Sequence, residues 1–315
     1  MLNILIAEPT HEILKIKLKN EGFNCDYIPE TDIEKLTARI TGYEGLIVRS
    51  KFKIDKNFID KAPKLKFIAR AGAGLENIDT EYAESKKIKI INSPEGNKDS
   101  VAEHATGMLL TLMHKIKIAD SEVRKGIWNR KNTGTEIKGK TIGIIGYGNT
   151  GSAFADRMKG FYANIKAYDK YKTGFSDNSV KEVTLEKLFN ETDILSIHLP
   201  LTKETKFMIN DNFINKFKKN IYIINTSRGK ILNTNDLVKN LKSGKVKGAC
   251  LDVLEYEKTS FEDIFEGQNS ESLKYLVNSE NVILTPHIAG SSEESYKKIA
   301  EVLANKIINE FKNNR

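Results

Sequence analysis

Cysteine is scarce in this 315-residue chain, and its scarcity excludes one class of architecture. Cys25 and Cys250 are the only cysteines, and no Cys or His spacing is typical of a metal site. We therefore expect neither a disulfide-stapled fold nor a bound metal. A reducing compartment, the cytoplasm, fits this composition best.

Long apolar runs are also lacking, which bears on membrane association. No run reaches the ~18 apolar residues that would suggest a membrane span. The apolar opening at residues 1–7 stops at Glu8 and Pro9 and lacks the basic leader of a signal peptide. The sequence therefore predicts no contact with a membrane.

Positive charge is in modest excess: the chain has 50 Lys and Arg residues and 42 Asp and Glu residues, which gives a formal net charge of +8. The basic residues are interleaved with acids, and even the densest basic stretch, residues 51–66, contains Asp55 and Asp60. A nucleic-acid partner is therefore not expected, whereas a small anionic substrate is compatible with the charge.

What the chain does have is the pattern of two α/β domains, and its length is typical of two compact cores. Short apolar runs alternate with amphipathic segments, which predicts parallel sheets covered by helices. The first series predicts strands at residues 3–7, 44–49, 65–71 and 89–92. The second predicts a doubly wound unit with strands at residues 141–146, 165–169, 194–199, 221–226, 248–253 and 282–285.

Helical spacing of apolar residues predicts two long helices outside those series. One runs from residue 100 to about Gly126, and the other runs from residue 293 to about 313 and returns to the first domain. Residues 258–277 show weak periodicity, so we expect a long surface excursion there. The domain boundaries follow: residues 1–98 and 288–315 in one domain, and residues 99–287 in the other.

A glycine-rich loop after residues 141–146 carries the strongest functional signal. Gly146, Gly148 and Gly151 form G-x-G-x-x-G between a buried strand and a helical pattern. Such glycines permit a tight turn, close approach of the backbone to pyrophosphate and close helix packing, while the helix N-terminus attracts phosphate. We therefore predict that residues 99–287 form a Rossmann domain that binds a dinucleotide.

Asp169 bears on the choice of dinucleotide, because it ends the next expected strand. A carboxylate there can accept hydrogen bonds from ribose hydroxyls and would repel a 2′-phosphate, which favours NAD over NADP. Nearby Lys170 and Lys172 weaken the second argument. The alternative for Asp169 is a turn residue at the end of a strand.

Three polar segments follow later strands, at residues 225–229, 251–257 and 285–290. The carboxyl ends of parallel strands form the ligand crevice. Hydride transfer with a 2-hydroxyacid needs a proton carrier, a cation for the carboxylate and a group that stabilises the charged carrier. His287, Arg228 and Glu257 have the chemistry for these roles, with Glu255 as a second contender for the last. Each residue alone could instead be an ordinary core or surface side chain.

These motifs together resemble the D-isomer-specific 2-hydroxyacid dehydrogenase family over almost the whole chain. The resemblance assigns the catalytic roles to Arg228, Glu257 and His287, and it implies a Rossmann domain inserted into a flavodoxin-like substrate domain. The chain departs from the family in having Lys258 where Pro is usual and a longer stretch between Glu257 and His287. The resemblance further implies cofactor contacts at Tyr147, Asn149, Thr150, His198, Pro200, Thr226 and Asp252.

Within the family, the chain resembles short phosphoglycerate dehydrogenases of serine biosynthesis that lack a regulatory domain. The resemblance rests on residues 48–51, 69–74 and 128–131. Arg49, Lys51 and Arg130 could surround a phosphate, and the N–H groups of Ala71, Gly72 and Ala73 could bind a carboxylate. The alternative is that Arg49, Lys51 and Arg130 are solvent-exposed surface residues without a ligand. The resemblance also implies a homodimer formed through residues 100–135.

Two rival functions stay open at this point. One is a glyoxylate, hydroxypyruvate or D-lactate reductase, which would not need the phosphate-binding cations. Formate dehydrogenases of the superfamily carry Gln at the position of Glu257 and are set aside. The other rival is an NAD-sensing corepressor, which the absence of added tails or interaction modules disfavours. Steady-state turnover separates an enzyme from a sensor.

Overall fold

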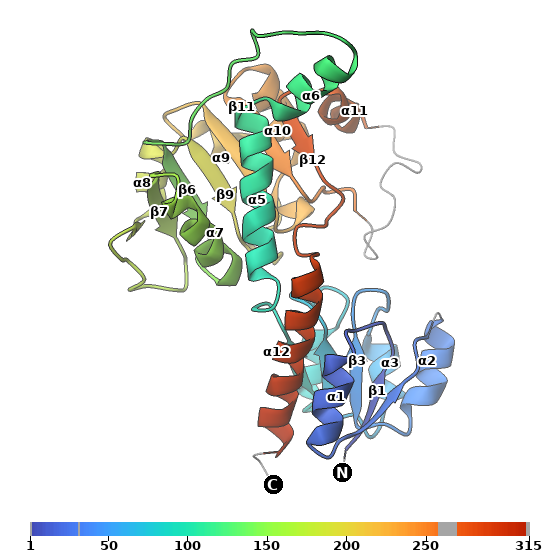
Figure 1. The fold of residues 1–315 in the computed structure, drawn as a ribbon. Helices are drawn as coiled ribbons and strands as arrows, with labels where there is room; N and C mark the ends of the chain where they lie inside the picture. Colours follow the sequence, from blue (N-terminus) through green and yellow to red (C-terminus); the bar gives the residue numbers. More distant parts are fainter. Residues whose placement is uncertain (1, 31, 258–269, 313–315) are drawn as a thin grey trace. The chain divides into compact units, whose positions relative to one another are not determined.

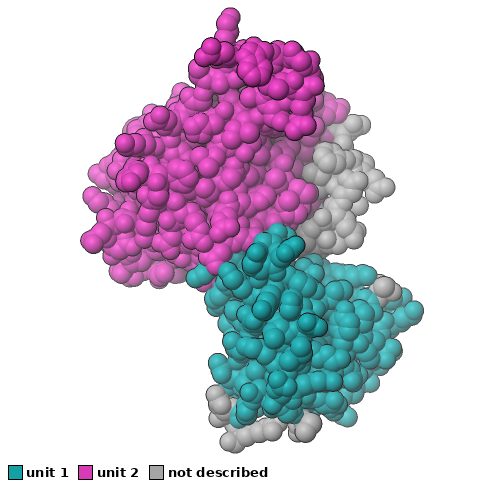
Figure 2. Space-filling view, in the orientation of Figure 1, with its two compact units in different colours: residues 1–98, 291–315 teal, residues 99–290 magenta. Residues whose placement is uncertain are grey.

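The computed structural model describes residues 2–30, 32–257 and 270–312. The chain divides into two compact units, coloured separately in Figure 2. Unit 1 comprises residues 1–98 and 291–315, and unit 2 comprises residues 99–290. Unit 2 is therefore an insertion in the sequence of unit 1.

Unit 1 is built on a parallel sheet of five strands in the order β2-β1-β3-β4-β5. This is the flavodoxin-like, doubly wound order. The strands are β1 (Asn3–Ile6), β2 (Asn24–Tyr27), β3 (Gly45–Val48), β4 (Phe67–Arg70) and β5 (Lys89–Asn92).

The helices of unit 1 cover both faces of that sheet (Figure 1). Asp32, Asp55 and Asp79 begin α2, α3 and α4, because each aspartate side chain accepts a backbone N–H of the first turn. On the other face, α1 packs against α12, where Leu303, Ala304 and Ile307 are buried. The helices are α1 (Ile13–Asn20), α2 (Ile33–Ile40), α3 (Lys56–Asp60), α4 (Thr80–Ser85) and α12 (Glu293–Lys312).

Unit 2 is built on a parallel sheet of seven strands in the order β12-β11-β10-β9-β6-β7-β8. The order reverses between β6 and β9, which is the switch point where Rossmann folds bind dinucleotides. The strands are β6 (Thr141–Ile145), β7 (Asn164–Tyr168), β8 (Val180–Glu182), β9 (Ile194–Ile197), β10 (Ile221–Asn225), β11 (Val246–Leu251) and β12 (Val282–Leu284).

Two apolar cores, one on each face of this sheet, fix the helices of unit 2. One core packs α5 and α7 against the sheet through residues such as Leu109 and Phe154. The other core packs the four helices α8, α9, α10 and α11 against the opposite face. The helices are α5 (Lys98–Met113), α6 (Ile116–Arg124), α7 (Asn149–Lys159), α8 (Leu185–Glu191), α9 (Asp211–Asn215), the 3-10 turn η1 (Gly229–Ile231), α10 (Thr234–Lys242) and α11 (Glu271–Asn278).

The predicted fold class is confirmed, whereas three local expectations are wrong. The single helix predicted from residue 100 to Gly126 is two helices, because Lys115 adopts a left-handed φ of 55°. There the carbonyl of Met113 accepts Thr135 N–H at 2.8 Å instead of continuing the helix. Strands β2 and β8 were not predicted.

The third correction concerns the excursion predicted at residues 258–277. Residues 258–269 lie outside the described residues, but α11 begins at residue 271. Its Leu273 and Leu276 are buried beside α10, and Ser270 caps its first turn. The end of the expected excursion is therefore a packed amphipathic helix.

The described part of the chain carries neither a membrane-spanning helix nor a metal-binding cluster. None of its helices combines the length and the apolar character needed to cross a membrane. Within the same residues, no group of three or more His, Cys, Asp or Glu side chains is arranged to hold a metal ion.

Candidate active site

The glycine loop joins β6 to α7 at the switch point of the unit 2 sheet. Gly146 has a φ of +90°, and a Cβ there would lie 2.2 Å from the carbonyl oxygen of His198. A Cβ on Gly151 would lie 2.1 Å from the carbonyl oxygen of Gly146. Both positions therefore require glycine for close packing of strand, loop and helix.

Two features of unit 2 fit a bound dinucleotide. A Cβ on Gly148, at the N-terminus of α7, would meet no atom within 4 Å, so the backbone there is open to a phosphate. The hydroxyl oxygen of Thr226, after β10, is buried and has no hydrogen-bond partner in the described structure. A buried polar atom without a partner is costly, and a bound cofactor would supply one.

Asp169 follows β7 directly beside this loop. Its carboxylate accepts the N–H groups of Tyr147 at 2.8 Å, Tyr171 at 2.9 Å and Lys172 at 3.0 Å. Burial acts to raise the pKa of Asp169, but the hydrogen bonds prevail and hold that pKa below its ordinary value. Asp169 is thus an ionised carboxylate at the carboxyl end of β7.

His198 lies beneath the glycine loop, at the end of β9. Its ring contacts the Ser196 hydroxyl at 2.8 Å and the Thr150 hydroxyl at 3.2 Å. Burial lowers the pKa of His198 to about 3, so the ring is neutral at ordinary pH. The neutral ring therefore links β9 to the first turn of α7.

The remaining predicted cofactor residues of this region sit around the same loop. Tyr147 is buried and stacks on Phe175 with ring centroids 4.3 Å apart. Asn149 and Thr150 open α7 and are partly buried, whereas Pro200 is exposed and its carbonyl accepts the Thr205 hydroxyl at 2.6 Å.

His287 and Glu257 are brought together from two loops that follow β12 and β11. His287 Nδ1 lies 2.7 Å from Glu257 Oε2, and both side chains are mostly buried, at 20% and 16% exposure. The second carboxylate oxygen of Glu257 accepts Leu254 N–H at 2.5 Å. Glu257 is therefore fixed by its own loop and holds the histidine ring.

Glu255, the second contender, points elsewhere. Its Oε2 accepts the N–H of Thr234 at 2.8 Å, at the N-terminus of α10. A carboxylate there satisfies a helix N–H and complements the helix dipole. The geometry gives Glu255 a structural contact and places Glu257 at the histidine.

Asp252 organises the turn that carries His287. Its carboxylate is 1% exposed and accepts Ile288 N–H and Ala289 N–H, each at 2.9 Å, and the Thr285 hydroxyl at 2.6 Å. Its carbonyl accepts His287 N–H at 2.8 Å, and His287 itself has a left-handed φ of 56°. Asp252 thereby holds a strained residue in place.

His104, a residue that the sequence did not single out, supports the same turn from α5. Its Nε2 lies 3.0 Å from the Thr285 hydroxyl, which donates to Asp252 and therefore accepts from His104. Only the tertiary fold brings α5 to this turn, since 181 residues separate the two partners.

Arg228 follows β10 at the same edge of the sheet. The amide of Asn225 donates to the Arg228 carbonyl at 3.0 Å, and Arg228 Nη1 donates to the Ser227 carbonyl at 2.7 Å. A Cβ on the next residue, Gly229, would lie 2.0 Å from the carbonyl carbon of Leu254. The arginine loop thus packs directly on the loop that ends in Glu257.

In unit 1, the predicted substrate residues follow the neighbouring strands β3 and β4. Buried Glu8, after β1, accepts Arg49 N–H at 2.6 Å and Lys51 N–H at 3.2 Å, so it fixes the backbone of both cations. The Arg49 guanidinium lies 5.7 Å from the ring centroid of Tyr296. Arg130 belongs to unit 2 and is exposed.

A third cation that the sequence did not single out joins this cluster. Arg70 Nε donates to the Arg49 carbonyl at 3.3 Å, and a Cβ on Gly72 would lie 1.8 Å from Arg70 Nη1. Gly72 therefore makes room for the guanidinium. Arg70 lies within the 69–74 motif, but no role was predicted for its side chain, and Glu8 belonged to no motif. Only the fold shows their contacts with Arg49.

The three N–H groups of residues 71–73 differ in their hydrogen bonds. Ala71 N–H continues the ladder to β3 by donating to Val48 O at 2.8 Å. Gly72 N–H donates to Arg70 O at 2.9 Å and approaches Ser93 Oγ at 3.2 Å. These two groups are already satisfied, which leaves Ala73 as the donor of the three for which the described structure shows no hydrogen bond.

Comparisons with known proteins agree with this geometry. Residues 106–289 match the model of the NAD-binding domain of D-isomer-specific 2-hydroxyacid dehydrogenases. The D-3-phosphoglycerate dehydrogenase of Archaeoglobus fulgidus is 35% identical over 311 residues, which are 98% of this chain but 57% of that protein. A hydroxypyruvate reductase of Thermotoga maritima is 38% identical over 279 residues, 88% of each chain.

A solved structure extends the likeness to both units. The D-lactate dehydrogenase of Aquifex aeolicus, complexed with NAD and lactic acid, matches with a TM-score of 0.83 at 29% identity, over 99% of this chain and 96% of that one. The sheet order and the glycine loop define a dinucleotide-binding domain of the Rossmann type. The chain belongs to the D-isomer-specific 2-hydroxyacid dehydrogenase family.

Proposed function

We propose that this protein is an NAD-dependent D-2-hydroxyacid dehydrogenase, which interconverts the hydroxyl and keto forms of a small carboxylate. The observation that carries the proposal is the 2.7 Å contact between His287 Nδ1 and Glu257 Oε2, at the carboxyl edge of a Rossmann sheet. Family membership supplies the reaction class.

His287 is the proton carrier in this proposal. Because Glu257 holds Nδ1, the substrate proton is exchanged at Nε2. Neutral His287 accepts the hydroxyl proton during oxidation, and the imidazolium returns a proton to the carbonyl oxygen during reduction. Ionised Glu257 attracts the imidazolium and orients the ring.

Arg228 is the cation for the substrate carboxylate and carbonyl oxygen, because its planar guanidinium can bind both through parallel hydrogen bonds. The packing of Gly229 on Leu254 sets its loop beside that of Glu257. The arginine that polarises the substrate carbonyl and the carboxylate that holds the proton donor therefore lie on adjoining loops.

The dinucleotide is proposed to lie along the glycine loop. NAD, when bound, supplies the hydride acceptor and donor of the reaction. Open Gly148 and the unpartnered hydroxyl of Thr226 fit the cofactor. A carboxylate has about four lone-pair sites, so Asp169 can accept ribose hydroxyls beside its backbone amides.

The substrate is proposed to carry a phosphate, with 3-phosphoglycerate and 3-phosphohydroxypyruvate, the pair of serine biosynthesis, as the best candidates. Arg49, Lys51 and Arg70 are the candidate phosphate ligands of unit 1: buried Glu8 fixes the backbone of Arg49 and Lys51, and Arg70 Nε donates to the Arg49 carbonyl. Exposed Arg130 is a further candidate ligand.

Comparing 2-keto acids with NADH tests this substrate. We expect kcat/KM for phosphohydroxypyruvate to exceed that for hydroxypyruvate, glyoxylate and pyruvate by tens-fold or more, because each charge-assisted contact contributes roughly 1.5–3 kcal/mol. The Arg49→Gln/Lys51→Gln variant should lose that preference, and Lys53→Gln, an exposed neighbour, should keep it. Equal or better use of hydroxypyruvate or glyoxylate by the unmodified protein would instead identify an unphosphorylated-acid reductase, in line with the Thermotoga relative.

A homodimer through residues 100–135 completes the proposal. No residue of α6 is buried, and Ile116, Val123, Ile127 and Trp128 are 51%, 51%, 50% and 80% exposed. Apolar surface gathered in this way is typical of an interface. Sedimentation velocity should find a dimer that Val123→Asp/Trp128→Ser dissociates; a monomeric unmodified protein would contradict this.

A further inference from the structure

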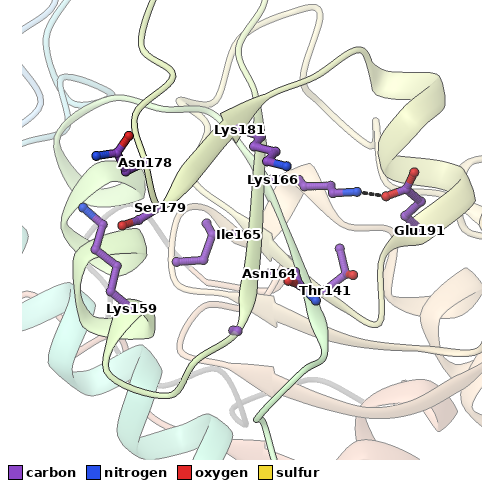
Figure 3. Close-up of a pocket in the computed structure, with 10 residues that line it drawn as sticks. Thr141, Lys159, Asn164, Ile165, Lys166, Asn178, Ser179, Lys181 and Glu191 are labelled. Atoms are coloured by element: carbon purple, nitrogen blue, oxygen red, sulfur yellow. Dashed lines mark ion pairs between the residues drawn. The ribbon is translucent and has the colours of Figure 1, made fainter.

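Unit 2 contains a cavity of about 440 Å³, whose lining residues are drawn in Figure 3. It lies at the ends of the strands opposite to the glycine loop. Thr141 begins β6 and Asn164 begins β7, whereas Gly146 and Asp169 follow the other ends of those strands. The cavity is therefore separate from the candidate active site. Its lining consists of Thr141, Lys159, Ala163, Asn164, Ile165, Lys166, Asn178, Ser179, Lys181 and Glu191.

The charged lining is mainly basic, with three lysines and one carboxylate. Lys166 on β7 and Lys181 on β8 are direct partners in the parallel register, so both side chains leave the same face of the sheet. Like charges placed directly opposite on neighbouring strands are destabilising. Lys159, at the end of α7, adds a third positive charge (Figure 3).

Nearby carboxylates pair with two of the three lysines. Lys159 pairs with both Asp156 and Asp177. Lys166 pairs with Glu191, which is shared with Lys187. No ion pair of Lys181 occurs in the described part of the chain, so the unbalanced positive charge lies at Lys166 and Lys181.

The titration of Lys166 reflects the same excess of positive charge. Burial is the largest cause that lowers the pKa of Lys166, and the positive charges of Lys187, Lys181 and Lys219 lower it further. An added anion would relieve the repulsion among these lysines. Polar groups of Asn178 and Ser179, and the hydroxyl of Thr141, complete a lining that can donate hydrogen bonds.

We propose that this cavity binds a small phosphate-bearing metabolite, held mainly by Lys166 and Lys181. The volume suits a small molecule. Two lysine ammonium groups attract an anion that carries several charges more strongly than they attract a single carboxylate. The site is independent of the proposed dehydrogenase activity, since none of its lining residues belongs to the candidate active site.

Pyrophosphate is a suitable probe, and NMR of backbone amides shows where it binds. The protein is saturated with NADH, so that the glycine loop is occupied, and pyrophosphate or citrate is then titrated to about 10 mM. We expect saturable shifts of the amides of residues 164–166 and 179–181 with pyrophosphate. Lys166→Gln/Lys181→Gln should weaken this binding at least ~10-fold, because it removes two charge-assisted contacts.

The matched control is Lys216→Gln/Lys218→Gln, which removes the same charge from exposed lysines after α9. This control variant should bind pyrophosphate as the unmodified protein does. Both double variants should keep the dehydrogenase kcat of the unmodified protein. The proposal is overturned if pyrophosphate leaves the amides of the cavity unshifted, if the two double variants bind equally, or if citrate alone binds there.

Discussion

The imidazole Nδ1 of His287 and the carboxylate Oε2 of Glu257 lie 2.7 Å apart, although 30 residues separate them in the chain. The contact depends on two fixed loops. Glu257 is anchored by Leu254 N–H, and the His287 turn is anchored by the Asp252 carboxylate. A histidine held in this way has one defined ring orientation, which proton transfer to a bound substrate requires.

Glu257→Gln should lower kcat for both keto reduction and alcohol oxidation. Oxidation forms the imidazolium of His287 and reduction uses it, and the neutral amide no longer attracts that charge or fixes the ring in the same way. Glu255→Gln is the matched control, because it should weaken the start of α10 and leave both kcat values near native. Initial rates at saturating substrate and cofactor measure the effect. A loss of kcat in Glu255→Gln, with native kcat in Glu257→Gln, would exchange the two assignments.

Asp252→Asn should lower kcat and also stability. Asparagine offers one acceptor oxygen, so either Ile288 N–H or Ala289 N–H loses its partner inside the protein. An unsatisfied buried donor costs about 1–3 kcal/mol of the free energy of unfolding. Urea unfolding and steady-state kinetics check the two effects. Native stability together with native kcat would show that Asp252 does not hold the turn.

The sequence predicted the strand ends of this site well and its side-chain partners less well. Buried apolar strands such as β6 and β10 stand out by composition, and the polar residues that follow them mark the crevice. Glu255 and Glu257 both follow β11 and lie two residues apart, so the residues alone kept both open, and the family resemblance favoured Glu257. The structure places Glu257 beside His287 and Glu255 at the start of α10. His104 and Glu8 act through contacts distant in sequence, which no local pattern reveals.

The missed elements have equally local reasons. Strands β2 and β8 are short and carry polar residues, as in Asn24 to Tyr27, so they lack an apolar run or clear alternation. The helix break at Lys115 follows from a tertiary contact, in which the returning chain at Thr135 takes the carbonyl of Met113. Helical periodicity continues across that break and conceals it.

Asp169→Ala should reduce the preference for NADH over NADPH. The variant loses the carboxylate that would accept ribose hydroxyls and repel a 2′-phosphate. Asp177→Ala is a suitable control, because its carboxylate also accepts backbone amides, those of Ser179 and Val180, but does not follow β7. The ratio of kcat/KM for the two cofactors is the measurement. Efficient use of NADPH by the unmodified protein would contradict the ribose assignment.

Buried His198 should make stability depend on pH below neutrality. Burial lowers the pKa of His198 to about 3 in the folded protein, so the unfolded chain binds its proton first as the pH falls. Stability is therefore complete above the ordinary histidine pKa of about 6.5 and declines between there and about pH 3, by about 2 kcal/mol at pH 5.

His198→Gln removes this titration and keeps a polar side chain near Ser196 and Thr150. Urea unfolding at about pH 7.5 and pH 5 should show a smaller pH difference for the variant than for the unmodified protein. If the free energy of unfolding changed equally between the two pH values in both proteins, groups other than His198 would account for the pH dependence of stability.

The most direct test of the central claim is NADH formation from D- and L-2-hydroxyacids by the unmodified protein and by His287→Ala. The account predicts turnover of a D-hydroxyacid, little of its L-isomer, and a loss of roughly 10²–10⁴-fold in kcat for the variant, the usual contribution of general acid–base catalysis. Near-native kcat in His287→Ala, or no turnover of any 2-hydroxyacid by the unmodified protein, would contradict it.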